Sequence, residues 1–343
     1  MPYKFFSNSY KTWQAMFEEI SFAKKSIYLE MYIFQDDITD FNFFNLLKEK
    51  AKAGLRVKII LDSFGSSGLS KNSIIELRES GIELIFLSYF LYRTHRKILI
   101  VDEKIAFIGG VNFHKNSLLW NDLMVRVKGK LVFSINKSFA RVYFNCGGKD
   151  PLVLLYNQKN LKTKMKDWLI EHFPINNKFN LKNIYKEHLL GAKNNIILCT
   201  PYFMPKRWLI GALHQAHLRG VRVEILIPKD TDHYFIDRLN YFFINKVYKL
   251  GINVFFENKM NHSKIMIIDN KEAIVGSNNL DYLSFEMNSE VGIFFNNKVP
   301  INQILNVING WKKETTYFNN KIYKMKFFDY ILYPFISMFF RIL

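Results

Sequence analysis

One pattern of residues occurs twice in the chain, and it constrains the fold more strongly than any other feature. Both copies fit H-x-K-x4-D-x6-G-[GS]-x-N with identical spacing, the first beginning at His95 and the second at His262. The segments ahead of each copy repeat as well: a strand-like run at 26–34 or 195–203, then a helical pattern, then a β-branched strand, and later another strand entry at 81–85 or 251–255. The order strand, helix, strand, helix, strand is therefore written twice, which predicts an α/β fold built from two similar half-domains.

Each half is expected to hold a mainly parallel or mixed sheet flanked by helices. The length of 343 residues suits about two domains of average size. We place the first half at 1–150 and the second at 151–320, joined by a Gly- and Pro-containing linker at 146–151. An aromatic and basic tail follows at 321–343.

Strand periodicity explains the spacing inside the motif. Residues two apart on a strand point to the same face, so a motif histidine and its lysine can project into one cleft. The turn after the motif aspartate reverses the chain into a second apolar strand, and this hairpin would return the motif asparagine to the level of the histidine. The candidate catalytic residues are His95, Lys97, Asp102, His262, Lys264 and Asp269, with Asn112 and Asn279 as amide donors. We interpret Asp102 and Asp269 as structural, since both lie at a strand end before the turn.

An acidic residue follows each motif at a similar distance, Asp122 after the first copy and Glu290 after the second. A nucleophilic histidine needs an acid on one ring nitrogen, which fixes the tautomer and leaves the other nitrogen free, and these two residues are candidates for that role. Histidine with aspartate could instead hold zinc or manganese, but the lysine beside each histidine repels a cation and suits a phosphate. We therefore expect no metal ion and no cofactor. The two cysteines, Cys146 and Cys199, lack the spacing of a zinc site or a disulfide framework.

Composition leaves the choice of partner open. Lys plus Arg number 48 against 30 for Asp plus Glu, so the net charge of +18 favours a polyanion, either nucleic acid or an anionic membrane. The codon bias of an AT-rich genome would give the same lysine excess. No apolar stretch reaches the ~20 residues that cross a bilayer, and no signal peptide is recognisable. The tail at 321–343 fits either a segment in the membrane interface or a C-terminal helix packed on the core.

At these motifs the sequence resembles the phospholipase D superfamily, whose signature is the duplicated H-x-K-x4-D motif, and more closely the bacterial cardiolipin synthases. The closer likeness rests on four consensus-like stretches, 26–34, 109–112, 200–205 and 276–284. The resemblance implies two halves related by a pseudo-twofold axis, with the two motif histidines facing each other across one phosphate. One histidine attacks phosphorus to form a phosphatidyl-enzyme, while the other protonates the departing alcohol and then deprotonates the incoming one.

The same resemblance assigns roles to the remaining motif residues. Lys97, Lys264, Asn112 and Asn279 bind the nonbridging oxygens and stabilise the charge of the transition state. By analogy His95 is the favoured nucleophile, although the nearly symmetric motif leaves that choice open.

The resemblance implies a phosphatidyltransferase that forms cardiolipin from phosphatidylglycerol, with that lipid or a second phospholipid as donor. The alternatives are a phospholipase D hydrolase that releases phosphatidic acid, and a nuclease or other phosphodiesterase; nucleic acid is disfavoured because the aromatic tail suits a membrane. The chain departs from the family pattern twice, because it begins without the two transmembrane helices of many members and has Leu283 where a basic residue is more common. We expect a peripheral enzyme on the cytoplasmic side of the bacterial inner membrane, with anionic phospholipids as partner and substrate.

Overall fold

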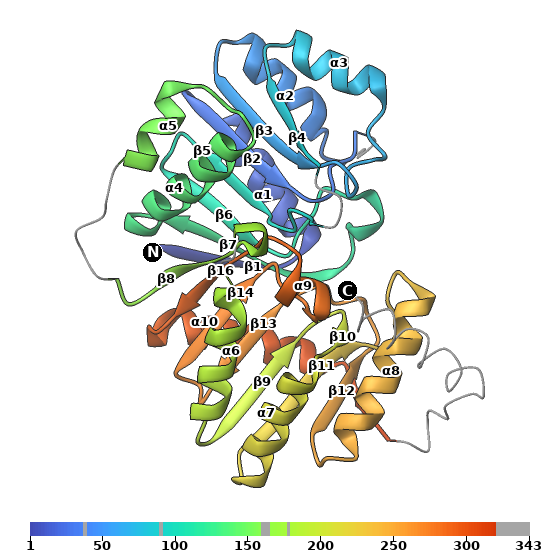
Figure 1. The fold of residues 1–343 in the computed structure, drawn as a ribbon. Coiled ribbons are helices and arrows are strands. Elements are labelled where there is room, and N and C mark those ends of the chain that lie inside the picture. The colour runs from blue at the N-terminus through green and yellow to red at the C-terminus, as the bar shows by residue number, and fades with distance from the viewer. Residues whose placement is uncertain (37–39, 89–91, 159–164, 177–178, 320–343) are drawn as a thin grey trace.

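The computed structural model describes residues 1–36, 40–88, 92–158, 165–176 and 179–319. Within these ranges the strands form a seven-stranded sheet, an eight-stranded sheet and a two-stranded ribbon. Figure 1 shows the two large sheets as the centres of two halves, the first running from the N-terminus to α5 and the second from β8 onward. The two α/β half-domains expected from the repeat are confirmed.

The first half contains the sheet β1-β7-β6-β5-β2-β3-β4, in which β2, β3 and β4 are parallel and the other pairs are antiparallel. Its elements are β1 (Tyr3–Asn8), α1 (Ser9–Ser21), β2 (Ser26–Met31), α2 (Phe43–Lys52), β3 (Arg56–Asp62), α3 (Lys71–Glu79), β4 (Glu83–Leu87), β5 (Ile98–Val101), β6 (Ile105–Gly109), the 3-10 turn η1 (Lys115–Ser117), β7 (Asn121–Lys128), α4 (Lys130–Asn145) and α5 (Pro151–Gln158).

The second half repeats this plan with the sheet β17-β12-β11-β9-β13-β14-β16-β8, in which β9, β11 and β12 are parallel. Its elements are β8 (Trp168–His172), the 3-10 turn η2 (Pro174–Asn176), α6 (Asn180–Gly191), β9 (Asn195–Cys199), β10 (Phe203–Met204), α7 (Arg207–Leu218), β11 (Arg222–Pro228), α8 (Tyr234–Tyr248), β12 (Asn253–Glu257), β13 (Ile265–Ile268), β14 (Glu272–Gly276), β15 (Leu280–Asp281), α9 (Tyr282–Glu286), β16 (Glu290–Phe295), α10 (Lys298–Lys312) and β17 (Thr315–Tyr317). Both sheets are thus mixed, with parallel pairing confined mainly to three strands of each.

The motif hairpins form as expected. In the first half β5 pairs with β6, placing Ile98 opposite Ile108, and in the second β13 pairs with β14 in the same register. The two-residue turns have positive φ at Asp102 (51°) and Asp269 (54°) and at the residue after each, which suits the twist of a tight hairpin. Each aspartate carboxylate also accepts three consecutive backbone N–H groups at the start of β2 or β9. These contacts explain why the motif contains an aspartate at a position outside the cleft.

The two halves share one hydrophobic core. Two buried clusters lie within single halves, beneath α1 and α2 and beneath α6 to α8. A third cluster combines β5 to β7 and α4 of the first half with β13, β14, β16 and α10 of the second, for example Ile108 with Val275. The halves are therefore parts of one folded unit. A boundary at residue 150 stays a prediction, and α5, just beyond it, packs on α4.

Among the described ranges, no helix has both the length and the apolar character needed to span a bilayer. The tail predicted at 321–343, for which two placements were open, lies outside the described residues.

Candidate active site

His95 and His262 line one cavity of about 360 Å³ between the two halves. Each lies just before its motif strand and is anchored by the opposite half: the His95 N–H donates to the Ser289 carbonyl (2.9 Å), and the His262 N–H donates to the Asn121 carbonyl (2.7 Å). Isolated β-bridges between the halves, Thr94 with Ser289 and Asn121 with Asn261, hold the two histidine segments against the opposite half. The histidines thus reach one cavity because each motif segment pairs with the other half.

The two acids also cross between the halves. Glu290, at the start of β16, contacts His95 of the first half, with both carboxylate oxygens 3.1 Å from Nδ1. Asp122, on β7, contacts His262 of the second half, with Oδ2 2.9 Å from Nδ1. The structure therefore brings both predicted acids to the histidines, but each acid belongs to the motif copy opposite its histidine. In both dyads Nε2 is left as the ring nitrogen available to a ligand.

Burial sets the protonation of both dyads. Burial lowers the pKa of His95 to about 4. Attraction by Glu290 opposes this shift, and repulsion from Lys97 adds to it. Burial and repulsion from Lys264 likewise lower the pKa of His262. Burial alone would raise the pKa of Glu290, but the contact with His95 holds it below its usual value. Near pH 7 both histidines are therefore neutral before substrate binds, with a lone pair on the free ring nitrogen.

The motif lysines lie behind the histidines. Lys97 Nζ donates to the His95 carbonyl at 2.6 Å, and Lys264 makes the same contact with the His262 carbonyl. Burial lowers the pKa of Lys97 well below its ordinary value and lowers the pKa of Lys264 to about 8. A phosphate anion between the histidines would raise the pKa of both lysines and favour their charged forms.

Asn112 and Asn279 both line the cavity, at equivalent places in the two halves. Asn112 Oδ1 accepts the Ile33 N–H (3.3 Å), which leaves its amide nitrogen as a donor for a ligand. Asn279 has a buried Oδ1 with no hydrogen-bond partner among the residues that the structure describes. Asp102 and Asp269, by contrast, are held at the hairpin turns and do not join the cavity lining.

Sequence reasoning missed several cavity residues. Tyr32 packs edge-on against His95 with ring centroids 4.9 Å apart, and Tyr202 lies in the same way 6.3 Å from His262. Both follow the first strand of their repeat, but Tyr32 aligns with Pro201 and Tyr202 with Ile33, so the repeat does not pair them. Trp120, 5.7 Å from His262, and Asp232 have no counterpart in the repeat that would have singled them out.

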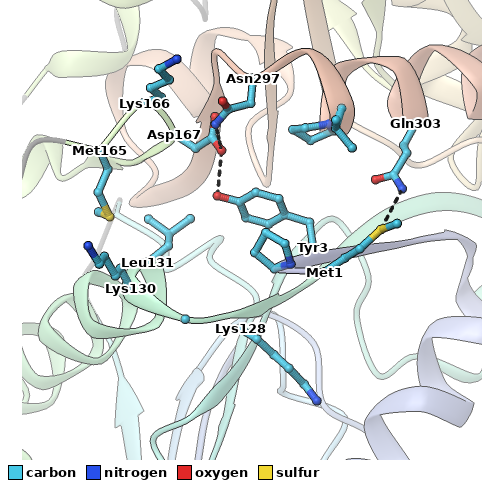
Figure 2. Close-up of a pocket in the computed structure, with 14 residues that line it drawn as sticks. Met1, Tyr3, Lys128, Lys130, Leu131, Met165, Lys166, Asp167, Asn297 and Gln303 are labelled. Atoms are coloured by element: carbon cyan, nitrogen blue, oxygen red, sulfur yellow. Dashed lines mark hydrogen bonds between the residues drawn. The ribbon is translucent and has the colours of Figure 1, made fainter.

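A larger cavity, about 610 Å³, lies away from the motifs, near the N-terminal strand and α10 (Figure 2). Its lining includes no histidine, and its carboxylate, Asp167, already accepts hydrogen bonds from the Tyr3 hydroxyl (2.9 Å) and the Asn297 amide (2.6 Å). Figure 2 shows Lys128 pointing away from this pair. Size alone therefore does not identify the reactive site. No cluster suited to a metal ion occurs within the described part of the chain.

Comparison with known proteins agrees with the geometry. The sequence model of the family described as "Cardiolipin synthase, PLD-like domain" matches residues 16–143 and 185–311. A cardiolipin synthase of Oceanobacillus iheyensis is 29% identical, covering 94% of this chain and 71% of its own length. The major cardiolipin synthase ClsA of Bacillus subtilis is 31% identical, covering 82% of this chain and 62% of its own. The chain spans less than two thirds of most of the curated relatives compared.

Solved structures show the same fold. Phosphatidylserine synthase of Haemophilus influenzae superposes with a TM-score of 0.76 over 98% of this chain and 93% of that one, at 14% identity. Polyphosphate kinase of Porphyromonas gingivalis gives a TM-score of 0.62 over 90% of this chain and 46% of that one, also at 14% identity.

Proposed function

This chain belongs to the cardiolipin synthase family of PLD-like domain proteins, and we propose that it is a phosphatidyltransferase that forms cardiolipin from phosphatidylglycerol through a phosphatidyl-histidine. One observation carries the proposal: two buried histidines share a cavity, each with its Nδ1 on a carboxylate of the other half. The names of the curated relatives support the lipid product.

In the first step, His95 Nε2 attacks the phosphorus of a phosphatidylglycerol, and the P–O bond to the glycerol headgroup breaks. His262, whose protonated form the bound phosphodiester anion favours, gives its proton to the leaving glycerol oxygen. In the second step, a hydroxyl of another phosphatidylglycerol returns a proton to His262 and attacks phosphorus, and the P–N bond to His95 breaks. The balance is two phosphatidylglycerols to one cardiolipin and one glycerol.

The remaining motif residues stabilise charge in this scheme. Lys97, Lys264, Asn112 and Asn279 bind the nonbridging oxygens, whose charge changes as phosphorus passes through its five-coordinate state. The acids hold the histidine tautomers and stabilise the imidazolium that forms at each proton transfer. All the groups that this scheme uses are side chains of the chain itself.

The net charge of +18 supports a peripheral location at an anionic membrane, which we place at its cytoplasmic face.

The test is incubation of the purified protein with vesicles of phosphatidylglycerol labelled in the headgroup glycerol and in the acyl chains. We expect labelled cardiolipin and free glycerol in equal amounts. Phosphatidic acid as the sole lipid product would assign hydrolysis instead. No lipid turnover, with cleavage of DNA, would assign a nuclease.

A further inference from the structure

Large apolar side chains are exposed around the mouth of the histidine cavity. Phe64 and Leu283 line the cavity and are exposed to solvent, Phe64 with 63% of its surface. Leu119, also exposed, directly precedes the lining residue Trp120. The three come from both halves, so the apolar character belongs to the mouth as a whole.

The start of α8 adds two aromatic rings to the same place. Tyr234 and Phe235 lie between the lining residues His233 and Ile236, and Phe235 exposes 66% of its surface. Their ring centroids are 6.1 Å apart, so the two rings form one exposed pair. Phe64 follows β3 and this pair follows β11, which places both at the carboxyl ends of the parallel strands. We call the set Phe64, Leu119, Tyr234, Phe235 and Leu283 the apolar rim.

Exposed apolar groups gathered at one place mark an interaction surface, because water opposes their exposure. The cavity of about 360 Å³ is at the small end of ligand sites and suits a headgroup and its phosphate, so the acyl chains of a phospholipid must stay outside. The rim lies where those chains would leave the cavity. Arg93, whose guanidinium lies 4.7 Å from the Phe64 ring, adds positive charge beside the rim, which complements anionic headgroups.

We propose that the apolar rim is the surface that inserts into the interface of an anionic phospholipid bilayer, so that substrate enters the cavity directly from the membrane. This inference rests on the proposed phospholipid substrate and deepens it, since it names the face of the protein that meets the lipid. Aromatic and aliphatic side chains of this kind partition into the headgroup and acyl boundary, where basic groups also bind.

The first experiment measures depth. Phe235→Trp is compared with Phe22→Trp in vesicles that contain phosphatidylglycerol and brominated phosphatidylcholine. Phe22 is 77% exposed and lies between α1 and the amino end of β2, whereas the rim lies at the carboxyl ends of the parallel strands. We expect bromine to quench the added fluorescence of the tryptophan at 235 and not that at 22. Quenching at 22 alone, or at neither position, would overturn the proposal.

The second experiment measures binding by vesicle flotation. Phe64→Ser/Phe235→Ser should partition at least about tenfold more weakly than the wild type, because two apolar groups no longer leave water. Phe22→Ser/Leu218→Ser is the matched control, since Leu218 is 64% exposed and ends α7; it should bind like the wild type. Thermal unfolding midpoints confirm that both variants fold. Equal binding of the rim variant and the wild type would overturn the inference, as would a rim variant that loses only self-association.

Neither readout needs turnover. Binding to vesicles through the rim without cardiolipin synthesis would reject the proposed function but support the proposed membrane surface. Cardiolipin synthesis, together with a rim variant that binds vesicles like the wild type, would support the proposed function but reject the membrane surface.

Discussion

The two halves hold the same motif but support their histidines differently. Glu290, which contacts His95, also accepts hydrogen bonds from the hydroxyls of Ser277 and Ser284, the latter at 2.8 Å. Asp122, which contacts His262, accepts instead the N–H of its own neighbour, Leu123, at 2.7 Å. The motif residues that face the ligand are thus symmetric, while the groups that hold the acids are not.

The layer beneath the motif strands differs as well. In the first half Arg96 forms a fully buried pair with Glu30 (2.9 Å), which Thr94 joins through its hydroxyl. Ser263 and Cys199 occupy the equivalent places of the second half. There a different carboxylate is buried: Glu257 accepts from the Asn261 amide at 2.9 Å, and burial raises its pKa to about 7. Such unequal support is what two histidines with different tasks would need, one attacking phosphorus and the other exchanging protons.

The largest expected effect separates the two histidines. His95→Asn should lower turnover about 10⁶-fold, as loss of a nucleophile does, and should leave the protein unlabelled by ³²P-phosphatidylglycerol. His262→Asn should lower turnover about 10²–10⁴-fold, the usual contribution of proton transfer, and labelled protein should accumulate. Radioactivity in acid-precipitated protein measures the intermediate.

His188→Asn is the matched control for these variants, because His188 also contacts an acid, Glu272 at 2.7 Å, but lies away from the cavity. Its turnover should equal that of the wild type. Label retained by His95→Asn and absent from His262→Asn would reverse the assignment of the nucleophile.

The next effect concerns stability. Arg96→Ser should lower the free energy of unfolding by about 3–5 kcal/mol, because it leaves the Glu30 carboxylate buried without its cation. Arg96→Ser/Glu30→Cys, which copies the second half, should be more stable than the single variant although it still lacks packing volume. Urea unfolding measures both.

Arg126→Ser is the control for that pair, because Arg126 and Glu19, at 2.8 Å, are partly exposed and their pairing contributes about 1 kcal/mol or less. A double variant less stable than Arg96→Ser alone would show that the unpaired Glu30 carboxylate is not what destabilises the single variant. The expected difference between the buried layers of the two halves would then be wrong.

Much of the fold and part of the site could be predicted because the signals are local. Strand periodicity and the two-residue turn suffice to bring His95 and Asn112 into one cavity, and the exact repeat extends this to His262 and Asn279. The crossing of Glu290 and Asp122 could not be predicted, because it depends on how the halves dock. Within one copy, each acid follows its own histidine, and the pairing of Thr94 with Ser289 and of Asn121 with Asn261 reverses the partnership.

The residue pair Gly110 and Ser277, at equivalent motif positions, tests the unequal support of the acids. A Cβ on Gly110 would lie 2.2 Å from Asp122 Oδ1, so Gly110→Ser should displace that carboxylate and lower kcat about a hundredfold through His262. Ser277→Gly removes one of two hydroxyls from Glu290 and should cost about tenfold through His95. KM should change little in both, since neither residue binds substrate.

Gly191→Ala is the control for these variants, because no atom beyond its chain neighbours and its own helix backbone lies within 4 Å of the added methyl group, and its kcat should match the wild type. A larger loss of kcat in Ser277→Gly than in Gly110→Ser would mean that kcat depends more on the hydroxyl groups that bind Glu290 than on the space beside Asp122.

The smallest expected effect is the pH dependence of kcat/KM, which reports the ionisation of groups in the free enzyme. On each limb of the profile, kcat/KM should change about tenfold per pH unit. Activity should fall as the pH drops toward 4, because His95, whose pKa burial lowers to about 4, then gains a proton and loses its nucleophilic lone pair. It should fall as the pH rises through the lowered pKa of His262, whose proton the leaving glycerol requires. It should fall more steeply above pH 8, because Lys264, whose pKa burial lowers to about 8, then loses the charge that binds phosphate.

The alkaline limb distinguishes the two lysines. Burial lowers the pKa of both lysines, that of Lys264 to about 8, which places the loss of the Lys264 charge on the alkaline limb. Lys264→Arg, which stays charged, should therefore remove the part of the fall near pH 8, while Lys97→Arg should leave that part in place whatever its effect on the maximum. A shift of the alkaline limb in Lys97→Arg and not in Lys264→Arg would assign the phosphate-binding charge to Lys97 of the first half. The asymmetry between the two halves would then be the reverse of the one expected.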